Sequence, residues 1–276
     1  MPKLPEHDVQ EVWHAYLTTG QPPQYVNLPW FESHRLRPLA RWLPASPRCR
    51  ICQYPFAGVG GLLARVALGI VPSKMNPLLC NVCERFADDF RGGAEVEASL
   101  VFADVRGSTQ LAAGMSPREF GQLIGRYYRA ATHELYHHNG MVEKLIGDGV
   151  TGFFVPGFAG PQHAQAAVLA GKAILEAVGH TDRSGPWIPV GVGVHTGTAY
   201  IGSVGTQGGG SDIVVLGDTP NLAARVAAAA GPGELVITDV AWQAAGLNWP
   251  GVAALELELK GRQEAVKAWV WQPAPG

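Results

Sequence analysis

Two aspartates lie where an extended segment meets glycine, a setting that suits metal and phosphate chemistry. Asp104 follows the apolar run at residues 100–102 and precedes the turn at Gly107, and Asp148 has glycine on both sides. Glycine allows a ligand to approach the backbone closely, and hard divalent cations prefer carboxylate oxygens. A pair of such ions can activate a hydroxyl and neutralise the charge on a phosphate. Aspartates are also common in ordinary turns, so these two residues alone leave both interpretations open.

The four cysteines form two CxxC pairs, Cys49 with Cys52 and Cys80 with Cys83. In a cytosolic chain, paired CxxC motifs favour a metal site over disulfides. Four thiolates match a tetrahedral Zn²⁺ site, and the segment resembles a zinc ribbon or treble clef. An iron–sulfur cluster uses the same ligands, and a redox-active set of free thiols is the third interpretation. The ligand spacing favours zinc.

Composition limits the kind of protein this is. The 276 residues carry a net charge of −2, without a basic field that would indicate nucleic-acid binding or an acidic block typical of a disordered tail. The polar N-terminus does not have the pattern of a secretory signal. The most apolar run, residues 59–71, contains Arg65 and is too short to span a bilayer. We therefore expect a soluble, cytoplasmic protein with no membrane span.

The chain divides into three regions by pattern. Residues 1–48 contain a predicted helix at 8–19 and an arm rich in proline and aromatic residues, which we expect to pack its rings on the body or on a partner. Residues 49–93 form the cysteine module, which ends in a helix predicted at 84–90. Gly92 and Gly93 indicate a boundary, because glycine commonly follows a helix C-terminus. Residues 94–276 form the third and largest region.

Within this third region, helices and strands are predicted to alternate. Ser116 and Glu119 form a capping box at the start of a helix, whose buried stripe comprises Phe120, Leu123, Ile124, Tyr127, Ala131 and Leu135. Strands at 141–146 and 151–155 form a hairpin with Asp148 at its tip. A second pair of strands, at 188–195 and 199–204, is predicted to turn at Gly197. The alternation predicts an α/β domain with helices packed on a sheet.

Five motifs in this region, taken in order, resemble the class III nucleotidyl cyclase domain. They are FADVRGST, EKLIGDG, GVHTG, LGDTPNLAAR and ELKGR, and the resemblance covers roughly residues 97–272. The resemblance implies a ferredoxin-like α/β fold and a head-to-tail homodimer with its active sites at the interface. It also implies the cyclisation of a nucleoside triphosphate, with pyrophosphate as the leaving group.

Carried over to this chain, the resemblance implies roles for individual residues. Asp104 and Asp148 match the two aspartates that hold a pair of Mg²⁺ or Mn²⁺ ions. Backbone N–H groups near Gly107 and Ser108 would cradle phosphate. Asn221 and Arg225, one helical turn apart, match the pair that orients the ribose and meets the charge on the α-phosphate. Lys260 matches a residue that contacts the β- and γ-phosphates, a part that Arg262 could share.

The base-reading positions are mixed. Lys144 matches the lysine that reads adenine in adenylyl cyclases, where guanylyl cyclases tend to have glutamate. The partner position, usually aspartate or threonine, is Val214, which cannot accept a hydrogen bond from the adenine amino group. Asp212, Ser211 or a backbone carbonyl could take its place. We therefore expect ATP as the substrate and a relaxed preference over GTP.

Two hypotheses follow for function. The first is a homodimeric adenylate cyclase for cyclic AMP signalling, with a zinc module that regulates or braces the dimer. A regulatory protein or small-molecule activator is a further possible partner of this cyclase. All the catalytic-type positions occur in one chain, so a homodimer would have two complete sites. The second is a weak or inactive nucleotide-binding regulatory module with a metal- or redox-sensing cysteine site, which Val214 favours.

Overall fold

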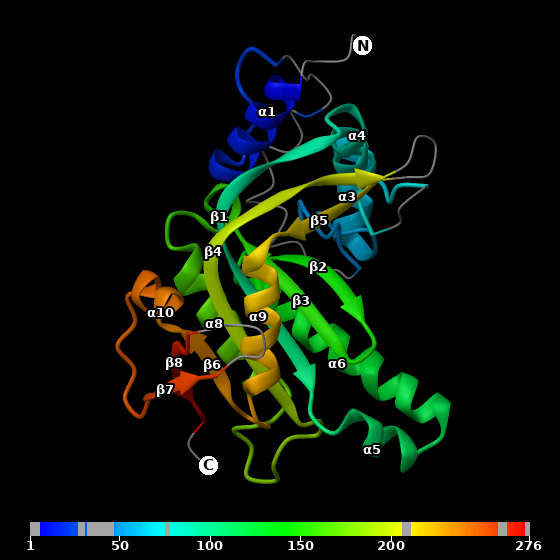
Figure 1. The fold of residues 1–276 in the computed structure, drawn as a ribbon. Coiled ribbons are helices and arrows are strands. Elements are labelled where there is room, and N and C mark those ends of the chain that lie inside the picture. Colours follow the sequence, from blue (N-terminus) through cyan, green and yellow to red (C-terminus); the bar gives the residue numbers. More distant parts are fainter. Residues whose placement is uncertain are drawn as a thin grey trace. The chain divides into compact units, whose positions relative to one another are not determined.

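The computed structural model describes residues 6–26, 31, 47–74, 78–205, 211–258 and 264–273 (Figure 1). Contacts divide the chain into two compact units. Unit 1 comprises Met1–Val96 and Tyr200–Leu216, and unit 2 comprises Glu97–Ala199 and Gly217–Gly276. Among the described residues, no helix is long and apolar enough to cross a membrane. The boundaries at residues 48 and 93 that the sequence indicates stay a prediction.

The described helices are α1 (Glu6–Thr19), α3 (Gly58–Leu68), α4 (Asn81–Asp89), α5 (Ser108–Ala113), α6 (Pro117–His137), α7 (Pro156–Ala159), α8 (His163–Ala177), α9 (Asp218–Ala229) and α10 (Asp239–Ala245). The strands are β1 (Gly92–Val105), β2 (Met141–Ile146), β3 (Gly149–Phe154), β4 (Val190–Gly205), β5 (Ser211–Leu216), β6 (Leu235–Thr238), β7 (Ala253–Leu257) and β8 (Val266–Trp271). The mixed α/β architecture agrees with the fold class that the sequence predicts.

Unit 2 is organised around one mixed sheet with the strand order β2-β3-β1-β4-β6-β8-β7. β3 pairs antiparallel with both β2 and β1, and Asp104 is opposite Gly149 in the β1–β3 register. β4 and β6 are parallel, and the connection between them contains α9. The predicted hairpin at 141–155 is confirmed, and it brings the residues around Asp148 beside the end of β1.

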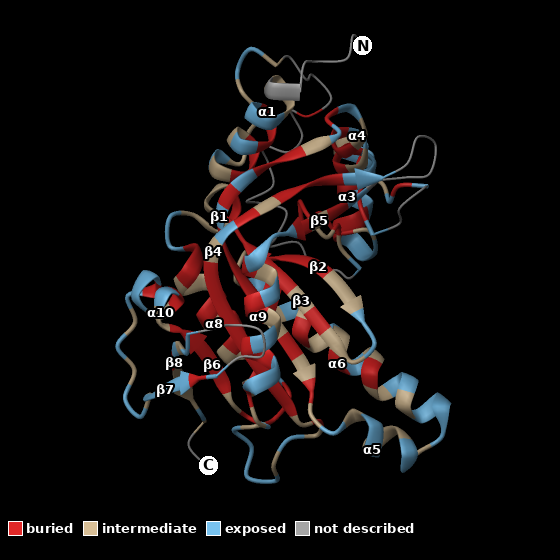
Figure 2. Cartoon of the chain, viewed as in Figure 1, coloured by how far each residue is buried: buried red, intermediate tan, exposed pale blue. Residues whose placement is uncertain are grey.

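Helices cover both faces of this sheet. A side chain at Gly171 of α8 would meet Val192 and Val194, whereas one at Gly193 would meet Ala227 of α9. Since alternate residues of a strand point to opposite faces, α8 and α9 lie on opposite sides of β4. The larger core cluster gathers residues of α6, α8 and α10, and the smaller one gathers residues of α9, β6, β7 and β8. Figure 2 shows the buried residues along the central strands.

The sequence-based prediction of a turn at Gly197 is wrong, because β4 is one continuous strand from Val190 to Gly205. The polar residue Thr196, which is typical of a turn, instead has a hydrogen-bond partner inside the fold. Thr196 Oγ1 lies 2.7 Å from Ser99 Oγ, and Ser99 Oγ lies 3.0 Å from His163 Nδ1. A Cβ at Gly197 would lie 2.9 Å from Thr219 Oγ1, so the close approach of α9 requires glycine within the strand.

The start of α6 confirms the capping box. The Ser116 hydroxyl accepts from the N–H of Glu119, and the Glu119 carboxylate accepts from the N–H of Ser116 at 2.8 Å. These bonds satisfy backbone donors that the first turn of a helix leaves unpaired. Ile124, Tyr127, Ala131 and Leu135 of the predicted stripe are buried, and Phe120 and Leu123 are partly buried against the same core.

In unit 1, an aromatic cluster joins α1 to α4. Trp13 and Tyr16 of α1 contact the ring of Phe86 with centroid distances of 5.2 and 4.6 Å, and Phe31 packs 5.4 Å from the same ring. The Trp13 Nε1–H donates to the carbonyl of Phe90 at 2.6 Å. The ring packing expected of the proline-rich arm is therefore present at Phe31, while Trp30 and Trp42 lie outside the described residues.

The same unit contains the hairpin of the second half of β4 with β5. In its antiparallel register, Gly202 is opposite Val214. β5 packs against α4, and its residues Ile213 and Val215 are buried. A Cβ at Gly202 would lie 2.4 Å from the Cα of Gly93, so two glycines permit β1 and β4 to approach closely at this point.

Candidate functional site

Asp104 and Asp148 are brought together by the β1–β3–β2 arrangement. The N–H of Val105 donates to the carbonyl of Asp148 at 3.3 Å, which ties the end of β1 to the tip of the β2–β3 hairpin. Burial, followed by the negative charge of Asp148, raises the pKa of Asp104 above its ordinary value. A carboxylate whose proton affinity is raised by burial and by a neighbouring carboxylate is in an electrostatic setting that a cation relieves.

Several neighbouring side chains hold this pair in place. Arg106 forms an ion pair with Asp104 at 3.0 Å, and its own N–H donates to the carbonyl of Pro189 at 2.8 Å. From α6, the Tyr128 hydroxyl donates to the carbonyl of Gly147 at 2.8 Å and so fixes the turn beside Asp148. The contact of Tyr128 with Gly147 could not be predicted from the sequence, since a tyrosine on a helix gives no sign of a distant partner.

The buried hydroxyl of Tyr127 bears on whether a cation fits this site. Tyr127 is fully buried, and its hydroxyl is without a hydrogen-bond partner among the described residues. Burial raises its pKa, and the charge of Asp104 adds to that effect. A buried hydroxyl beside two carboxylates normally has a partner. Together with the oxygen donors of Asp104 and Asp148, this unpaired hydroxyl fits a hydrated divalent ion.

The other predicted site residues of unit 2 lie on separate elements. Gly107 has a φ of 68°, a conformation that glycine adopts readily, and it forms the turn that leads into α5, where Ser108 is the first residue. Asn221 and Arg225 occupy the exposed face of α9, and the Asn221 amide donates to the carbonyl of Gly217 at 3.1 Å. Lys260 and Arg262 lie outside the described residues.

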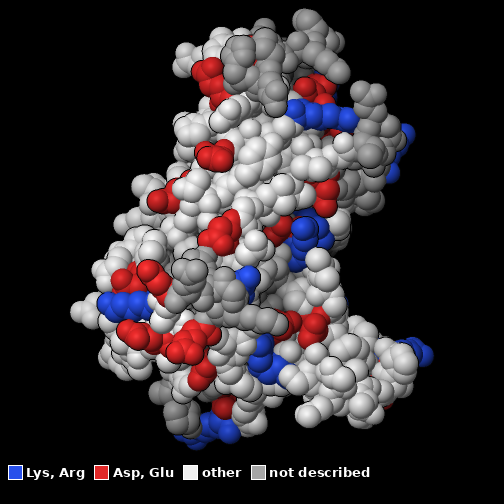
Figure 3. All heavy atoms as spheres, viewed as in Figure 1, with Lys and Arg blue, Asp and Glu red and all other residues white. Residues whose placement is uncertain are grey.

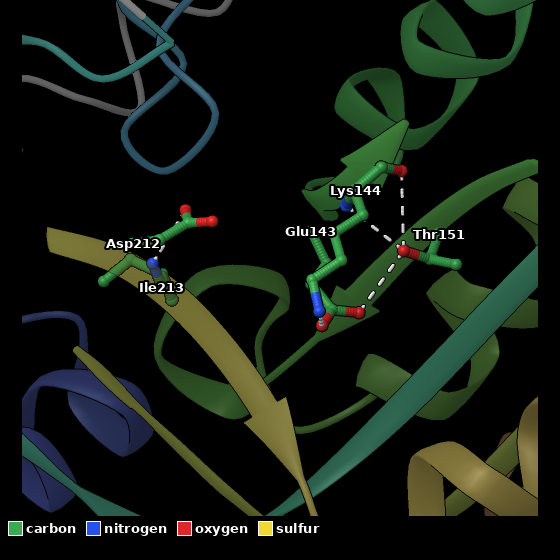
Figure 4. A network of polar contacts seen from close by, with 5 residues as sticks. All are labelled: Glu143, Lys144, Thr151, Asp212 and Ile213. Carbon is green, nitrogen blue, oxygen red and sulfur yellow. Dashed lines mark hydrogen bonds and ion pairs between the residues drawn. The ribbon is translucent and has the colours of Figure 1, made fainter. Parts of the chain in front are cut away.

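Lys144, on β2, is partly exposed and pairs with its neighbour Glu143. In unit 1, Val214 lies on β5 between the buried residues Ile213 and Val215. The nearby Asp212 carboxylate accepts a hydrogen bond from the N–H of Ile213 at 3.0 Å (Figure 4). Val214 itself offers no polar side-chain atom, as the sequence indicates.

The four cysteines form a compact cluster in unit 1. Their sulfur atoms all lie within 4.8 Å of one another, and all four residues are buried. A tetrahedral zinc with Zn–S bonds of 2.3 Å would place its sulfurs about 3.8 Å apart, so the cluster is close to that arrangement. The four clustered cysteines fit a small metal module.

The backbone around the cluster supports negative charge on sulfur. The N–H of Cys80 points to the sulfur of Cys49, and the N–H of Cys83 points to the sulfur of Cys80, both at 3.3 Å. Cys80 is also the N-cap of α4. Burial raises the pKa of Cys52 and Cys83 well above the ordinary value. Burial also acts to raise the pKa of Cys49, but hydrogen bonds from the other three thiols outweigh it and lower that pKa.

Charged residues on the visible face in Figure 3 are interspersed, with basic and acidic side chains mixed over that surface. Paired carboxylates at a strand end suit divalent cations, and the exposed Asn–Arg pair on α9 and the lysine on β2 are side chains that can contact a phosphorylated ligand.

The comparisons with known proteins identify the class. The family described as "Adenylate and Guanylate cyclase catalytic domain" matches residues 94–272. The chain therefore belongs to the class III nucleotidyl cyclase family. Catalytic domains of this family bind nucleotide, use divalent metals such as Mg²⁺ or Mn²⁺, and function as dimers.

Among curated relatives, an adenylate cyclase from Anabaena cylindrica is 31% identical over 133 residues, which are 46% of this chain and 26% of the relative. Adenylate cyclase 1 from Rhizobium meliloti is 30% identical over 135 residues, 47% of this chain and 20% of the relative. The matches thus span 20–26% of the length of these relatives.

Solved structures agree in fold. The guanylyl cyclase Cya2 is similar with a TM-score of 0.58 and 24% identity, covering 65% of this chain and 93% of that one. The adenylyl cyclase CyaB from P. aeruginosa is similar with a TM-score of 0.56 and 22% identity, covering 66% and 97%. The mixed α/β fold of class III cyclases is confirmed.

Proposed function

We propose that this chain is an adenylate cyclase that converts ATP to cyclic AMP and pyrophosphate at the interface of a homodimer. The observation that carries the proposal is the pairing of Asp104 with Asp148 at the end of β1. Lys144 on the adjoining strand supports ATP over GTP, and so do the relatives named adenylate cyclase.

The proposed roles follow from the chemistry of each group. Asp104 and Asp148 would hold Mg²⁺ or Mn²⁺, which supplies activation of the ribose 3′-hydroxyl and neutralises phosphate charge. Arg225 would bind the α-phosphate as negative charge develops there, and Asn221 would hold the ribose in line for attack. Backbone N–H groups at Gly107 and Ser108, and the side chain of Lys260, would bind the remaining phosphates.

The exposed position of Asn221 and Arg225 supports a shared site. Both side chains lie on the outer face of α9, where a second copy could receive them. If each site takes its aspartates from one copy and its Asn–Arg pair from the other, Asp104→Ala and Arg225→Ala proteins would each be inactive alone. Mixed together, they would recover part of the activity, because one of the two sites in each mixed dimer would be intact.

The cysteine cluster is proposed to bind one zinc ion. An iron–sulfur cluster held by the same four sulfur ligands is the alternative. The zinc would stabilise a segment whose own core is small. Elemental analysis of the purified protein would decide between one zinc per chain and iron with matching sulfide. The cytoplasmic location that the sequence pattern predicts stays a prediction.

The first experiment is product identification with purified protein, ATP or GTP, and Mn²⁺. Cyclic AMP from ATP, lost in Asp104→Ala, would support the enzyme. Cyclic GMP as the main product would refute the substrate assignment but not the class. A second function, a nucleotide-binding regulatory module, is favoured by Val214. It would be supported by folded dimers that bind ATP and release no cyclic nucleotide with either substrate.

A further inference from the structure

Glu143 is a buried carboxylate at an irregular point of β2. It is only 7% exposed, although glutamate is among the residues most often found at the surface. The β2–β3 register shifts between Val142 and Lys144, so Glu143 occupies a β-bulge. Neighbours in a regular strand point to opposite faces, but a bulge changes the direction of its side chains. Here it allows Glu143 to contact the residue that follows it.

The contacts form a closed set around Lys144 (Figure 4). The Lys144 ammonium lies 3.5 Å from Glu143 Oε1. The Thr151 hydroxyl, from the opposite strand, lies 3.3 Å from Glu143 Oε2, to which it can donate. The same hydroxyl accepts from the backbone N–H of Lys144 at 3.1 Å. Thr151 and Glu143 therefore constrain both the backbone and the side chain of Lys144.

Stability alone does not account for this arrangement. Burial of a carboxylate is costly unless it is paired, and the side chain of its partner Lys144 is 40% exposed. Ion pairs with an exposed partner contribute little to folding. A buried carboxylate that is anchored by a hydroxyl and holds a half-exposed ammonium is instead the kind of support that fixes the geometry of a binding residue.

We propose that Glu143, anchored by Thr151, is a positioning residue that fixes the Lys144 ammonium for adenine and thereby sets the preference for ATP over GTP. The inference rests on the proposed function, in which Lys144 contacts the base. It explains how a preference for ATP could persist although Val214 provides no acceptor for the adenine amino group.

The preference follows from the two purine edges. Adenine N1 is an acceptor, whereas guanine N1 carries a hydrogen, so a fixed ammonium opposite N1 meets an acceptor in ATP and a donor in GTP. A site built around one hydrogen bond rejects an analogue that cannot form it. An ammonium released from Glu143 could move to guanine O6, which is an acceptor. Loss of Glu143 should therefore weaken ATP binding and improve the relative binding of GTP.

Binding is measured with 3′-deoxy-ATP and 3′-deoxy-GTP, which lack the attacking hydroxyl and cannot cyclise. In full-length Glu143→Gln, we expect the Kd for 3′-deoxy-ATP to rise roughly three- to tenfold, which lies in the lower part of the range of coupling between side chains in one network. The Kd for 3′-deoxy-GTP should change less. With ATP as substrate, KM should rise while kcat changes little, because the base end of the nucleotide is remote from the reacting phosphate. Thr151→Val should act in the same direction.

A double-mutant cycle with Lys144→Met separates positioning from a general structural role. If Glu143 acts through Lys144, Glu143→Gln should have no further effect on either Kd in the Lys144→Met protein. The matched control is Glu176→Gln, which breaks the Lys172–Glu176 ion pair of α8 and should leave both Kd values unchanged. Circular dichroism establishes that each variant is folded, and Glu143→Asp, which keeps the charge, should retain part of the preference.

The outcomes distinguish this inference from the proposed function. A wild-type protein that binds and cyclises ATP, with the same ATP-to-GTP ratio of Kd values in Glu143→Gln, would overturn the role of Glu143 alone. Effects that add in the double mutant would do the same. A wild-type protein that neither binds 3′-deoxy-ATP nor forms cyclic AMP would overturn both. Loss of the preference in Glu143→Gln and Thr151→Val, absent from the Lys144→Met background, supports the proposal.

Discussion

The close packing of α9 on β4 leads to a sharp prediction about Gly193. A Cβ at this position would lie 2.3 Å from the backbone nitrogen of Ala227, 2.5 Å from its Cα and 2.8 Å from its Cβ. Two of these three atoms belong to the backbone, so no change of rotamer can relieve the contact. In Gly193→Ala, α9 must move outward by about 1 Å to restore ordinary contact distances.

The effects of this displacement on stability and on catalysis can both be estimated. Overpacking of a well-packed interior costs about 1–3 kcal/mol, which for a chain of this size lowers Tm by roughly 2–12 °C. Because α9 carries Asn221 and Arg225, the same movement displaces the two side chains proposed to act on the ribose and the α-phosphate. A misplacement of about 1 Å in such groups can reduce kcat about a hundredfold.

The assay compares thermal unfolding and cyclic-nucleotide production in Gly193→Ala and Gly121→Ala. Gly121 lies on the exposed surface of α6, and a Cβ there meets nothing within 4 Å, so alanine should leave kcat unchanged and Tm equal or slightly higher. Adding Ala227→Gly to Gly193→Ala removes only the side-chain contact and should restore little. Wild-type kcat in Gly193→Ala, with Tm lowered as expected, would refute the claim that the position of α9 limits catalysis.

Three further outcomes are expected. Removal of the proposed zinc by a chelator should lower the Tm of the wild-type protein. Cys80→Ser, which already lacks one ligand, should start from a lower Tm and lose less on chelation. An equal loss of Tm in both proteins would argue against a metal held by Cys80. Burial lowers the pKa of His163 below its ordinary value, so the unfolded chain binds the proton more tightly than the folded one. The free energy of unfolding should therefore fall as the pH is lowered below the ordinary pKa of histidine. In His163→Gln this dependence, measured by urea unfolding between pH 5 and 8 at roughly 25 °C, should be shallower. Trp13→Phe removes the donor to Phe90 and leaves a buried carbonyl unpaired, which should cost about 1–3 kcal/mol in chemical denaturation without altering the KM for ATP.

The parts of the fold that could be predicted from the sequence are those fixed by local chemistry. The capping box at Ser116 and the glycine-flanked tip at Asp148 involve residues a few positions apart, so their geometry follows from spacing alone. In the long strand β4, the sequence wrongly predicts a turn at Gly197, because threonine beside glycine is typical of a turn. Threonine and glycine occur here because of contacts with residues distant in the sequence: Thr219 approaches Gly197, and Ser99 bonds to Thr196.

The candidate site shows the same division. The apolar pattern predicts that Asp104 follows a strand and that Asp148 lies at a hairpin tip, whereas their pairing is implied only by the resemblance to the cyclase family and depends on how β1 pairs with β3. The bulge at Glu143 could not be predicted, because a register shift depends on the pairing of two strands and leaves no mark in the sequence of one. The support from Tyr128 depends likewise on how α6 crosses the hairpin.

The packing of β5 against α4 has a consequence for any shortened form of this protein. The family match begins at residue 94, so a recombinant fragment cut there would keep β5 and lose the helix that covers it. Ile213 and Val215, buried in the full chain, would then face solvent and promote aggregation. A fragment that retains residues 47–93 would avoid this exposure. The stretch that defines membership of the family is thus shorter than the stretch that has to be expressed for the β4–β5 hairpin to remain covered.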